Sequence, residues 1–180
     1  CLCSGGIAQT VSTLFARGYT VIPEPQKVLL EPQDFTFDHN WRLNLDKSVA
    51  SNDIAVETLR DDLSARFHLT LDGEGKFGGV ISLRIARGSV PIRSAQGRNR
   101  NALEEQAYRI ELHRDSIAIT ANADTGLFYG VETLVQLLRP DLGTLWLPEG
   151  TIEDWPDLQL RHIYWDDNHH LEKMDDFKRA

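Results

Sequence analysis

Alternating apolar and polar residues mark a series of short strands along the chain. The alternation is clear at 81–85, 108–112 and 117–119, and shorter alternating segments precede them at 27–30, 35–37 and 41–45. A period of two residues is typical of strands that bury one face and leave the other to solvent. Arg114 and Asp115 separate two of these segments, which predicts a hairpin. The early segments follow the proline-punctuated stretch 21–25, so we expect them near a sheet edge.

Two further segments repeat apolar residues at helical spacing. The first predicted helix is capped by Ser51 or Asn52, and its apolar face consists of Val56, Leu59, Leu63 and Phe67. The second begins at a capping Asp124 and carries a broad apolar face. The residues of that face are Leu127, Phe128, Val131, Leu134, Val135 and Leu138, and Pro140 and Gly143 end the helix.

The second predicted helix contains two glycines one turn apart, Gly126 and Gly130. Each glycine weakens a helix by roughly 1 kcal/mol relative to alanine. We therefore expect another part of the backbone to approach the helix closely at these positions. Packing explains both glycines without a ligand.

Three polar segments separate these elements. Residues 72–79 are rich in glycine but lack the Gly-Lys-Ser/Thr ending of a phosphate-binding loop, so they predict a turn-rich connector. The arginine-containing stretch 87–101 lacks aromatic residues and predicts a solvated loop, with polyanion binding as the alternative. The composition of 148–157 is typical of a linker.

The pattern as a whole predicts an α+β fold. We expect a mostly antiparallel sheet with two helices packed on one face, because no strand–helix–strand rhythm is evident. This domain is expected to span 20–147, followed by the linker 148–157. Residues 158–180 then predict the first strand and helix of a truncated (β/α)8 barrel.

Composition and charge narrow the classes of partner. The chain has 41% apolar and 26% charged residues, which is ordinary for a globular domain, and no apolar run approaches a membrane-spanning length. Its net charge of −8 makes nucleic acid an improbable partner. We therefore expect neither a nucleic-acid partner nor a membrane span.

The first residues predict export. Residues 1–19 begin with Cys1 and Cys3, and small residues lead to a cleavage-like position at Ala8. The segment is interpreted as the remnant of a signal peptide, with a disordered terminus as the alternative. The expected location is periplasmic, extracellular, or the cell surface through a lipid anchor.

Acidic and histidine residues gather between Arg161 and His170, after a short apolar strand. Asp166 and the neighbouring histidines are metal-ligand types, but their spacing matches no defined metal motif. A catalytic pair within one short segment is disfavoured, because it would have to flank a substrate from both sides. The remaining interpretation is the rim of a barrel pocket. There Arg161 would aim its guanidinium at sugar hydroxyls or form a structural ion pair.

Residues 107–138 resemble a known family. The run Gly-Leu-Phe-Tyr-Gly-Val-Glu-Thr-Leu-Val-Gln-Leu-Leu at 126–138 closely resembles the domain that precedes the catalytic barrel in family 20 glycoside hydrolases. The stretch 21–25 is similar to the start of that domain, and 152–156 followed by Leu160 and Arg161 is similar to the passage into the barrel. The resemblance covers roughly residues 20 to 175.

The resemblance implies a β-N-acetylhexosaminidase-like exo-glycosidase acting on glycans that end in N-acetylglucosamine or N-acetylgalactosamine. In this family the acetamido group of the substrate is the nucleophile, and the mechanism is retaining. The implied substrate-binding residues are Arg161, Asp166 and His170. The catalytic Asp-Glu pair is expected beyond Ala180, in the remainder of the barrel, so the chain alone is expected to be inactive. Neither a cofactor nor a metal is implied.

A different class of function stays open from the residues themselves. The chain is alternatively a non-catalytic carbohydrate-recognition or scaffold domain that supports an adjacent enzyme of another specificity.

Overall fold

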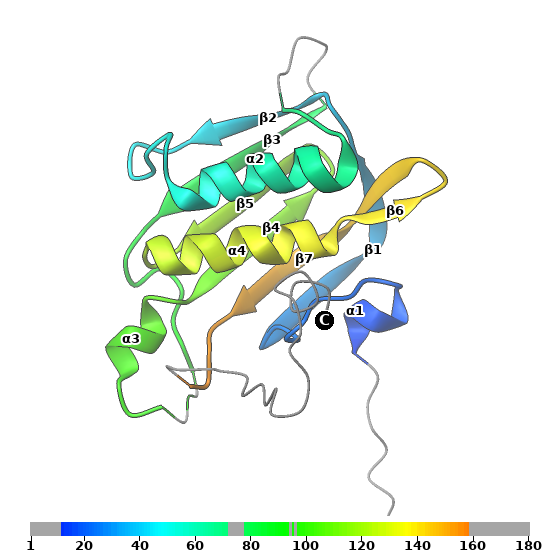
Figure 1. Cartoon of the computed structure of the whole chain (residues 1–180). Helices are drawn as coiled ribbons and strands as arrows, with labels where there is room; N and C mark the ends of the chain where they lie inside the picture. The colour runs from blue at the N-terminus through cyan, green and yellow to red at the C-terminus, as the bar shows by residue number, and fades with distance from the viewer. Residues whose placement is uncertain (1–11, 72–77, 94, 96, 159–180) are drawn as a thin grey trace, which may run out of the picture.

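The computed structural model describes residues 12–71, 78–93, 95 and 97–158 (Figure 1). These residues form one layer of β-sheet and one layer of helices. Seven strands make a single sheet in the order β1-β7-β4-β5-β3-β2, with β6 pairing to β7 outside this path. Their bounds are β1 Lys27–Phe37, β2 Trp41–Leu45, β3 Gly79–Ile85, β4 Tyr108–His113, β5 Ser116–Ala121, β6 Arg139–Asp141 and β7 Thr144–Asp154.

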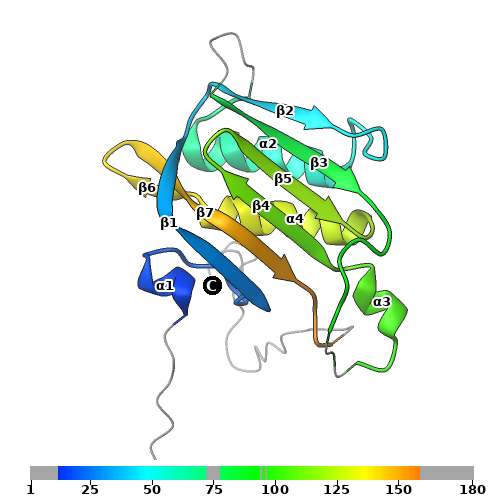
Figure 2. The same cartoon turned by 180° about the vertical axis from the view of Figure 1, so that it is seen from behind.

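The two long helices lie on the same face of the sheet. They are α2 (Ile54–Phe67) and α4 (Asp124–Leu137), while α1 (Thr13–Ala16) and α3 (Arg100–Glu104) are short. Figure 1 shows α2 and α4 side by side in front of the strands, and Figure 2, from behind, shows the opposite face of the sheet without a covering helix. The predicted α+β class and the predicted placement of the helices are confirmed.

One part of the predicted topology is wrong. Strand β2 leads through α2 into β3, and β2–β3 and β3–β5 are parallel pairs, while the other pairings are antiparallel. The strand–helix–strand unit was missed because β2 is short and only half-buried, so its apolar pattern is weak. A helix that returns along a sheet places the next strand parallel to the first. The sheet is therefore mixed, although mostly antiparallel.

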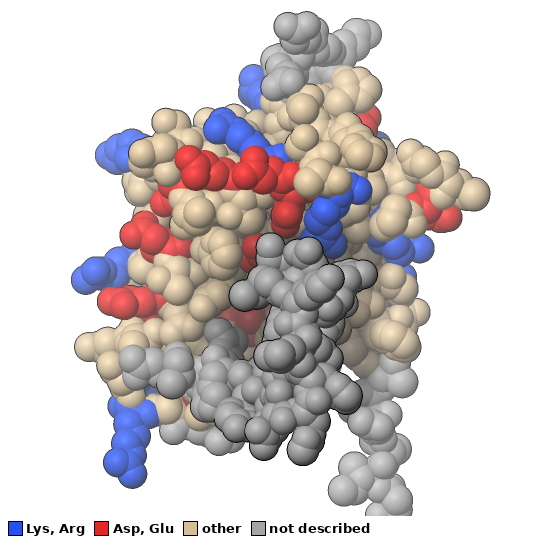
Figure 3. Space-filling model, viewed as in Figure 1, with Lys and Arg blue, Asp and Glu red and all other residues tan. Residues whose placement is uncertain are grey.

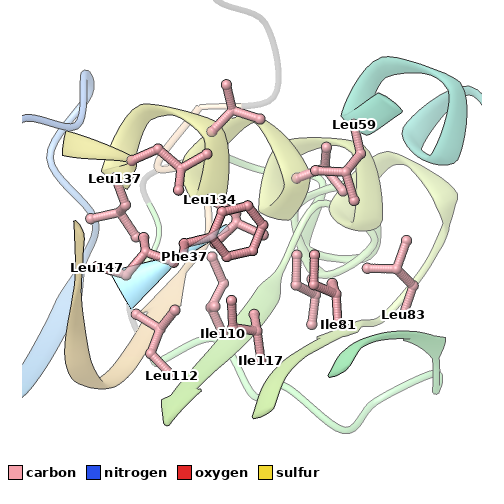
Figure 4. Packing of buried hydrophobic residues seen from close by; sticks show 14 of the residues in the cluster. Phe37, Leu59, Ile81, Leu83, Ile110, Leu112, Ile117, Leu134, Leu137 and Leu147 are labelled. Atoms are coloured by element: carbon pink, nitrogen blue, oxygen red, sulfur yellow. The ribbon is translucent and has the colours of Figure 1, made fainter. Parts of the chain in front are cut away.

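The core fills the space between sheet and helices (Figure 4). Side chains from the two middle strands meet α4 there, and their exposed fraction is close to zero. Each such burial contributes about 1.5–3 kcal/mol relative to an exposed side chain. The residues labelled in Figure 4 are Phe37, Leu59, Ile81, Leu83, Ile110, Leu112, Ile117, Leu134, Leu137 and Leu147.

The helix starts differ slightly from those predicted. Asp53, rather than Ser51 or Asn52, caps α2, and its carboxylate accepts a hydrogen bond from the Ala55 N–H at 2.8 Å. In α4 the cap position is Ala123, which makes no side-chain hydrogen bond, and Asp124 is the first helical residue. An acidic residue in the first turn still interacts favourably with the helix dipole.

The close approach of another backbone is confirmed at Gly126, whereas at Gly130 the close neighbours are the side chains of Ile119 and Tyr108. A Cβ at Gly126 would lie 2.6 Å from the backbone oxygen of Ala107, and one at Gly130 would lie 2.7 Å from Cγ2 of Ile119. Gly126 also donates its N–H to the Glu105 oxygen at 3.1 Å. Helix α4 therefore touches the chain entering β4 directly, which only glycine permits.

The predicted linker 148–157 is wrong for most of its length. Strand β7 continues to Asp154 and pairs with both β1 and β4, so it lies inside the sheet. Its proline and glycine are typical of linkers, but here they belong to an irregularity where β1 shifts register between Leu30 and Asp34. Gly150, opposite Leu30, has φ +146°, and a Cβ at this position would collide with the backbone of Leu29 and Leu30, so no side chain fits.

The predicted solvated loop 87–101 is partly packed. Val90 and Ile92 are buried with Leu103 and Trp155 in a second, smaller apolar cluster. The Asn122 side chain fixes this loop, because its amide donates to the Val90 oxygen at 2.8 Å and its oxygen accepts from the Val90 N–H at 2.9 Å. The loop was mispredicted because two isolated apolar residues give no periodic signal.

Candidate functional site

The three predicted substrate-binding residues, Arg161, Asp166 and His170, lie outside the described residues, as do residues 159–180 of the predicted barrel segment and residues 1–11 of the signal remnant predicted at 1–19. The rest of that predicted remnant is ordered, because it contains α1 and the buried Tyr19. The roles of the three substrate-binding residues stay predictions. The nearest described structure is the end of β7, from which the chain continues through Trp155 to Leu158. A groove lies there, and it is the candidate site.

The groove has a volume of about 460 Å³ and lies between α4, the approach to β1 and the end of β7. Apolar and polar side chains both line it. The lining residues are Val21, Ile22, Pro23, Gln106, Tyr108, Phe128, Tyr129, Glu132, Thr133, Gln136, Asp154 and Pro156. The groove therefore joins the beginning and the end of the domain, which are distant in sequence.

A buried hydrogen-bond network forms the floor of the groove. The Tyr108 hydroxyl lies 2.5 Å from Oγ1 of Thr133 and donates to Oδ2 of Asp154 at 3.2 Å. Thr133 is only 4% exposed, so its hydroxyl needs a partner within the protein. The network fixes β4, α4 and the end of β7 relative to one another.

The approach to β1 is tied to the same floor. Oε1 of Gln136 accepts the Ile22 N–H at 2.9 Å, and Oδ1 of Asp154 accepts the Gln26 N–H at 3.1 Å. The peptide bond between Ile22 and Pro23 is cis. The two hydrogen bonds from Ile22 and Gln26 hold the segment from Val21 to Gln26 against the groove.

Acidic side chains gather on this face, with basic side chains around them. Figure 3 shows Asp and Glu side chains gathered on the surface over α2 and α4. In the groove, partial burial raises the pKa of the Glu132 carboxyl, and the nearby Asp62 charge raises it further, while the Arg66 charge opposes both. Glu132 is therefore more easily protonated than an ordinary glutamate.

The polar groups on the floor of the groove are bonded to one another and to the approach to β1. The Asp154 carboxylate accepts from the Tyr108 hydroxyl and from the Gln26 N–H, and the Thr133 hydroxyl lies against the Tyr108 hydroxyl. Ile22 is 75% exposed at the rim and adds apolar surface there. Across the described ranges no group of three or more His, Cys, Asp or Glu side chains could hold a metal ion. The described helices also include none long and apolar enough to cross a membrane.

Sequence reasoning missed the groove. Tyr108 and Thr133 look like ordinary strand and helix residues, and Asp154 was assigned to a linker. The available signal was the polar Thr133 within the apolar run of α4, because a buried hydroxyl implies a polar partner.

Comparison with known proteins gives the family. Residues 18–155 match the model of "Glycosyl hydrolase family 20, domain 2". A β-hexosaminidase from Vibrio furnissii is 32% identical over 82 residues, which cover 46% of this chain and 13% of that protein.

Solved structures share the fold. The chitobiase of Flavobacterium johnsoniae matches 91% of this chain and 25% of its own, with a TM-score of 0.62 and 22% identity. The β-N-acetylhexosaminidase of Streptomyces coelicolor matches 74% of this chain and 26% of its own, with a TM-score of 0.53 and 28% identity. A mutant β-hexosaminidase of Streptomyces plicatus in complex with GlcNAc matches with a TM-score of 0.54 and 27% identity, over 74% of this chain and 26% of its own.

These relatives are glycoside hydrolases, and the chain spans about a quarter or less of their lengths. The matched residues extend through β7, in agreement with the place of that strand inside the sheet. The chain belongs to glycosyl hydrolase family 20, and residues 18–155 correspond to domain 2 of that family.

Proposed function

We propose that the chain is the accessory N-terminal part of an exo-acting glycoside hydrolase that removes terminal N-acetylhexosamine by substrate-assisted retaining hydrolysis. The family match over 18–155 is the observation that carries this proposal. The relatives are several times longer than the part they share with this chain, which supports a catalytic barrel elsewhere in the full protein.

In this proposal the domain serves as a support for the barrel. Strand β7 is held by β1 on one side and β4 on the other, and the chain leaves it beside the groove at Asp154. A strand fixed on both sides gives the following residues a defined starting point. The exposed Ile22 and the half-buried Phe128 and Tyr129 supply apolar surface for packing.

The proposed substrate is a glycan that ends in N-acetylglucosamine or N-acetylgalactosamine. The Streptomyces plicatus relative is described with GlcNAc bound, which supports this class. Arg161 is proposed to donate hydrogen bonds to sugar hydroxyls, with Asp166 and His170 beside it, and the acid and acetamido-orienting carboxylates would follow beyond Ala180. Export stays a prediction from residues 1–8.

The test compares this chain with the full-length protein on a chromogenic N-acetylglucosaminide. We expect no turnover by the 180-residue chain and clear turnover by the full-length protein. In the latter, Arg161→Ala should lower kcat/KM by about 100-fold, the effect of losing roughly 3 kcal/mol of charged hydrogen bonding in the transition state.

The control is Arg87→Ala in the full-length protein, because Arg87 is exposed on the described surface. It should leave kcat/KM unchanged. Turnover by the 180-residue chain itself would contradict the accessory role. A folded full-length protein without activity on either N-acetylhexosaminide would contradict the proposed reaction.

A further inference from the structure

A second hollow lies away from the groove, where β1, β7 and the turn between β4 and β5 meet. Its volume is about 440 Å³, and it combines one large aromatic side chain with groups of both charges. The lining residues are Gln33, Asp34, Phe35, Thr36, Arg114, Trp146 and Glu149. Figure 2 shows β1 running beside β7 next to the β6 hairpin.

Trp146 provides an aromatic surface in this hollow. It pairs in register with Thr36 on β1 and with Arg139 on β6, and its side chain is half-buried. Its sequence neighbour Leu147 is fully buried in the core, so the alternation of β7 turns Trp146 to the other face of the sheet. Within the described ranges, the indole contacts no other ring and its N–H has no hydrogen-bond partner.

Arg114 and Glu149 lie on one side of the hollow. The Arg114 backbone N–H donates to Oε1 of Glu149 at 3.0 Å, which holds this carboxylate at the rim. The Arg114 guanidinium is exposed and forms no ion pair with any residue that the structure describes. The hollow is thus lined by an arginine, whose planar group has five donors, and by a carboxylate with acceptor positions left over.

Asp34 provides a second carboxylate and is already fixed in place. It forms ion pairs with Arg17 and, at 3.5 Å, with Arg139. Arg139 in turn stacks over the ring of Tyr19 at 5.0 Å. A carboxylate oriented by two arginines keeps lone pairs for further donors, and it loses little conformational freedom when a ligand binds.

We propose that this hollow binds a neutral saccharide through stacking on Trp146 and hydrogen bonds to Arg114, Glu149 and Asp34. One face of a pyranose ring presents C–H groups that pack against an indole, while each hydroxyl is both a donor and an acceptor. The carboxylates can accept hydrogen bonds from sugar hydroxyls, and the guanidinium can donate to them. A ligand with a net charge would instead meet a like charge on one side of the hollow.

The proposed site is non-catalytic and goes beyond the accessory role. None of its residues belongs to the groove or to the predicted pocket at Arg161. It would hold a second part of a glycan chain on the sheet edge. Its test is binding without turnover, so it succeeds or fails independently of the hydrolase proposal.

The experiment is an NMR titration of the 180-residue chain with the trisaccharide of N-acetylglucosamine and, separately, with cellotriose. We expect saturable shifts of the Trp146 indole N–H and of the Thr36 and Glu149 amides, with a Kd on the order of 1 mM. Trp146→Ala should weaken binding about tenfold, because the stacking surface is lost. Arg114→Ala should weaken it several-fold.

Arg87→Ala is the matched control, since it removes an exposed arginine from another loop and should leave the Kd unchanged. Arg114 is exposed in a turn, so its variant tests the site even where Trp146→Ala impairs folding. Trp146→Phe gives a second check, with an expected loss of a few-fold. Shifts that do not saturate with either trisaccharide, or equal weakening by Arg87→Ala and Arg114→Ala, would overturn the proposal.

Discussion

The two faces of the sheet are built on different principles, although they share the same strands. On the helix side of β4, Ile110 and Leu112 are completely buried against α4 and its surroundings. On the opposite side of the same strand, Arg109 and Glu111 are half-buried and no helix covers them (Figure 2). On the helix face, the space available restricts which side chains can be accommodated. On the open face, the charges of neighbouring side chains restrict them.

A charged row on the uncovered face shows what this difference means. Lys27, Glu153 and Arg109 lie opposite one another on three adjacent strands. Glu153 is the central member, bonded to Lys27 at 3.0 Å through Oε2 and to the Arg109 guanidinium at 2.7 Å through Oε1. Burial would raise the pKa of Glu153, but its hydrogen bonds to these two cations lower it below its ordinary value.

The two faces should tolerate substitutions differently. Where α4 contacts the chain before β4, neighbouring atoms are backbone and cannot move aside cheaply. Where charges meet across strands, long side chains can rearrange and water replaces lost partners. We therefore expect volume changes on the helix face to cost more than charge changes on the open face.

The largest effect is expected for Gly126→Ala. The new methyl group would lie 2.6 Å from the Ala107 oxygen and 3.0 Å from the Glu105 oxygen, so α4 must shift away from β4. Overpacking of this kind costs about 1–3 kcal/mol and exceeds the gain in helix propensity. Thermal unfolding should show a Tm lower by about 4–8 °C.

Thr125→Ala is the control for this change, because Thr125 precedes Gly126 in α4 and is exposed. It raises helix propensity without adding a contact, so its Tm should stay the same or rise slightly. An unchanged Tm for Gly126→Ala would show that the contact between α4 and Ala107 is not tight, and the proposed difference between the faces would fail.

A smaller and pH-dependent effect is expected for Glu153→Gln. The substitution leaves Lys27 and Arg109 partly exposed without their shared carboxylate, which should cost about 1–2 kcal/mol near neutral pH. A lowered folded-state pKa contributes stability above the ordinary glutamate pKa of about 4.3, and this stability is lost as the pH falls through the folded value. Denaturant unfolding between pH 7 and pH 3 should show the gap between wild type and variant closing.

Arg84→Ala serves as the reference on the same face. Arg84 lies on β3 and is exposed, so its removal should change the free energy of unfolding by less than about 0.5 kcal/mol. A gap for Glu153→Gln that stays constant with pH would mean that packing, rather than charge, is responsible.

The smallest expected effect has the opposite sign. The raised pKa of Glu132 means that the folded state disfavours its carboxylate, which costs stability as the pH rises through the folded value. Glu132→Gln should therefore match wild type at low pH and be more stable at neutral pH, by less than about 0.5 kcal/mol after solvent screening. Unfolding curves at pH 4 and pH 7.5 would distinguish this from a variant that is destabilised at both values.

Much of the fold was predictable from the sequence because its local signals agree with its tertiary contacts. The alternation along β4 and β5 and the apolar face of α4 both report burial directly. Strand β7 was missed because its proline and glycine serve an irregular pairing with β1, a contact more than 100 residues away in sequence. Local composition carries no information about such a distant partner.

The candidate groove was not predictable for a related reason. Its floor joins Tyr108, Thr133 and Asp154 from three separate elements, and only Thr133, which is polar within the apolar run of α4, gives a local signal. The family resemblance was carried by the run 126–138, in which Gly126 fits against the backbone at Ala107. The pocket expected at Arg161 lies outside the described residues, so its prediction rests on the residue pattern and on that resemblance.

The position of β7 also constrains the order in which the protein can be completed during synthesis. Strand β1 pairs with β7, and Lys27 finds its partner only when Glu153 has been made. In a nascent chain, β1 therefore has no strand to pair with until nearly the whole domain has emerged from the ribosome. The strand that completes this sheet is also the last one before residues 158–180, so the domain closes just as synthesis of the next segment begins.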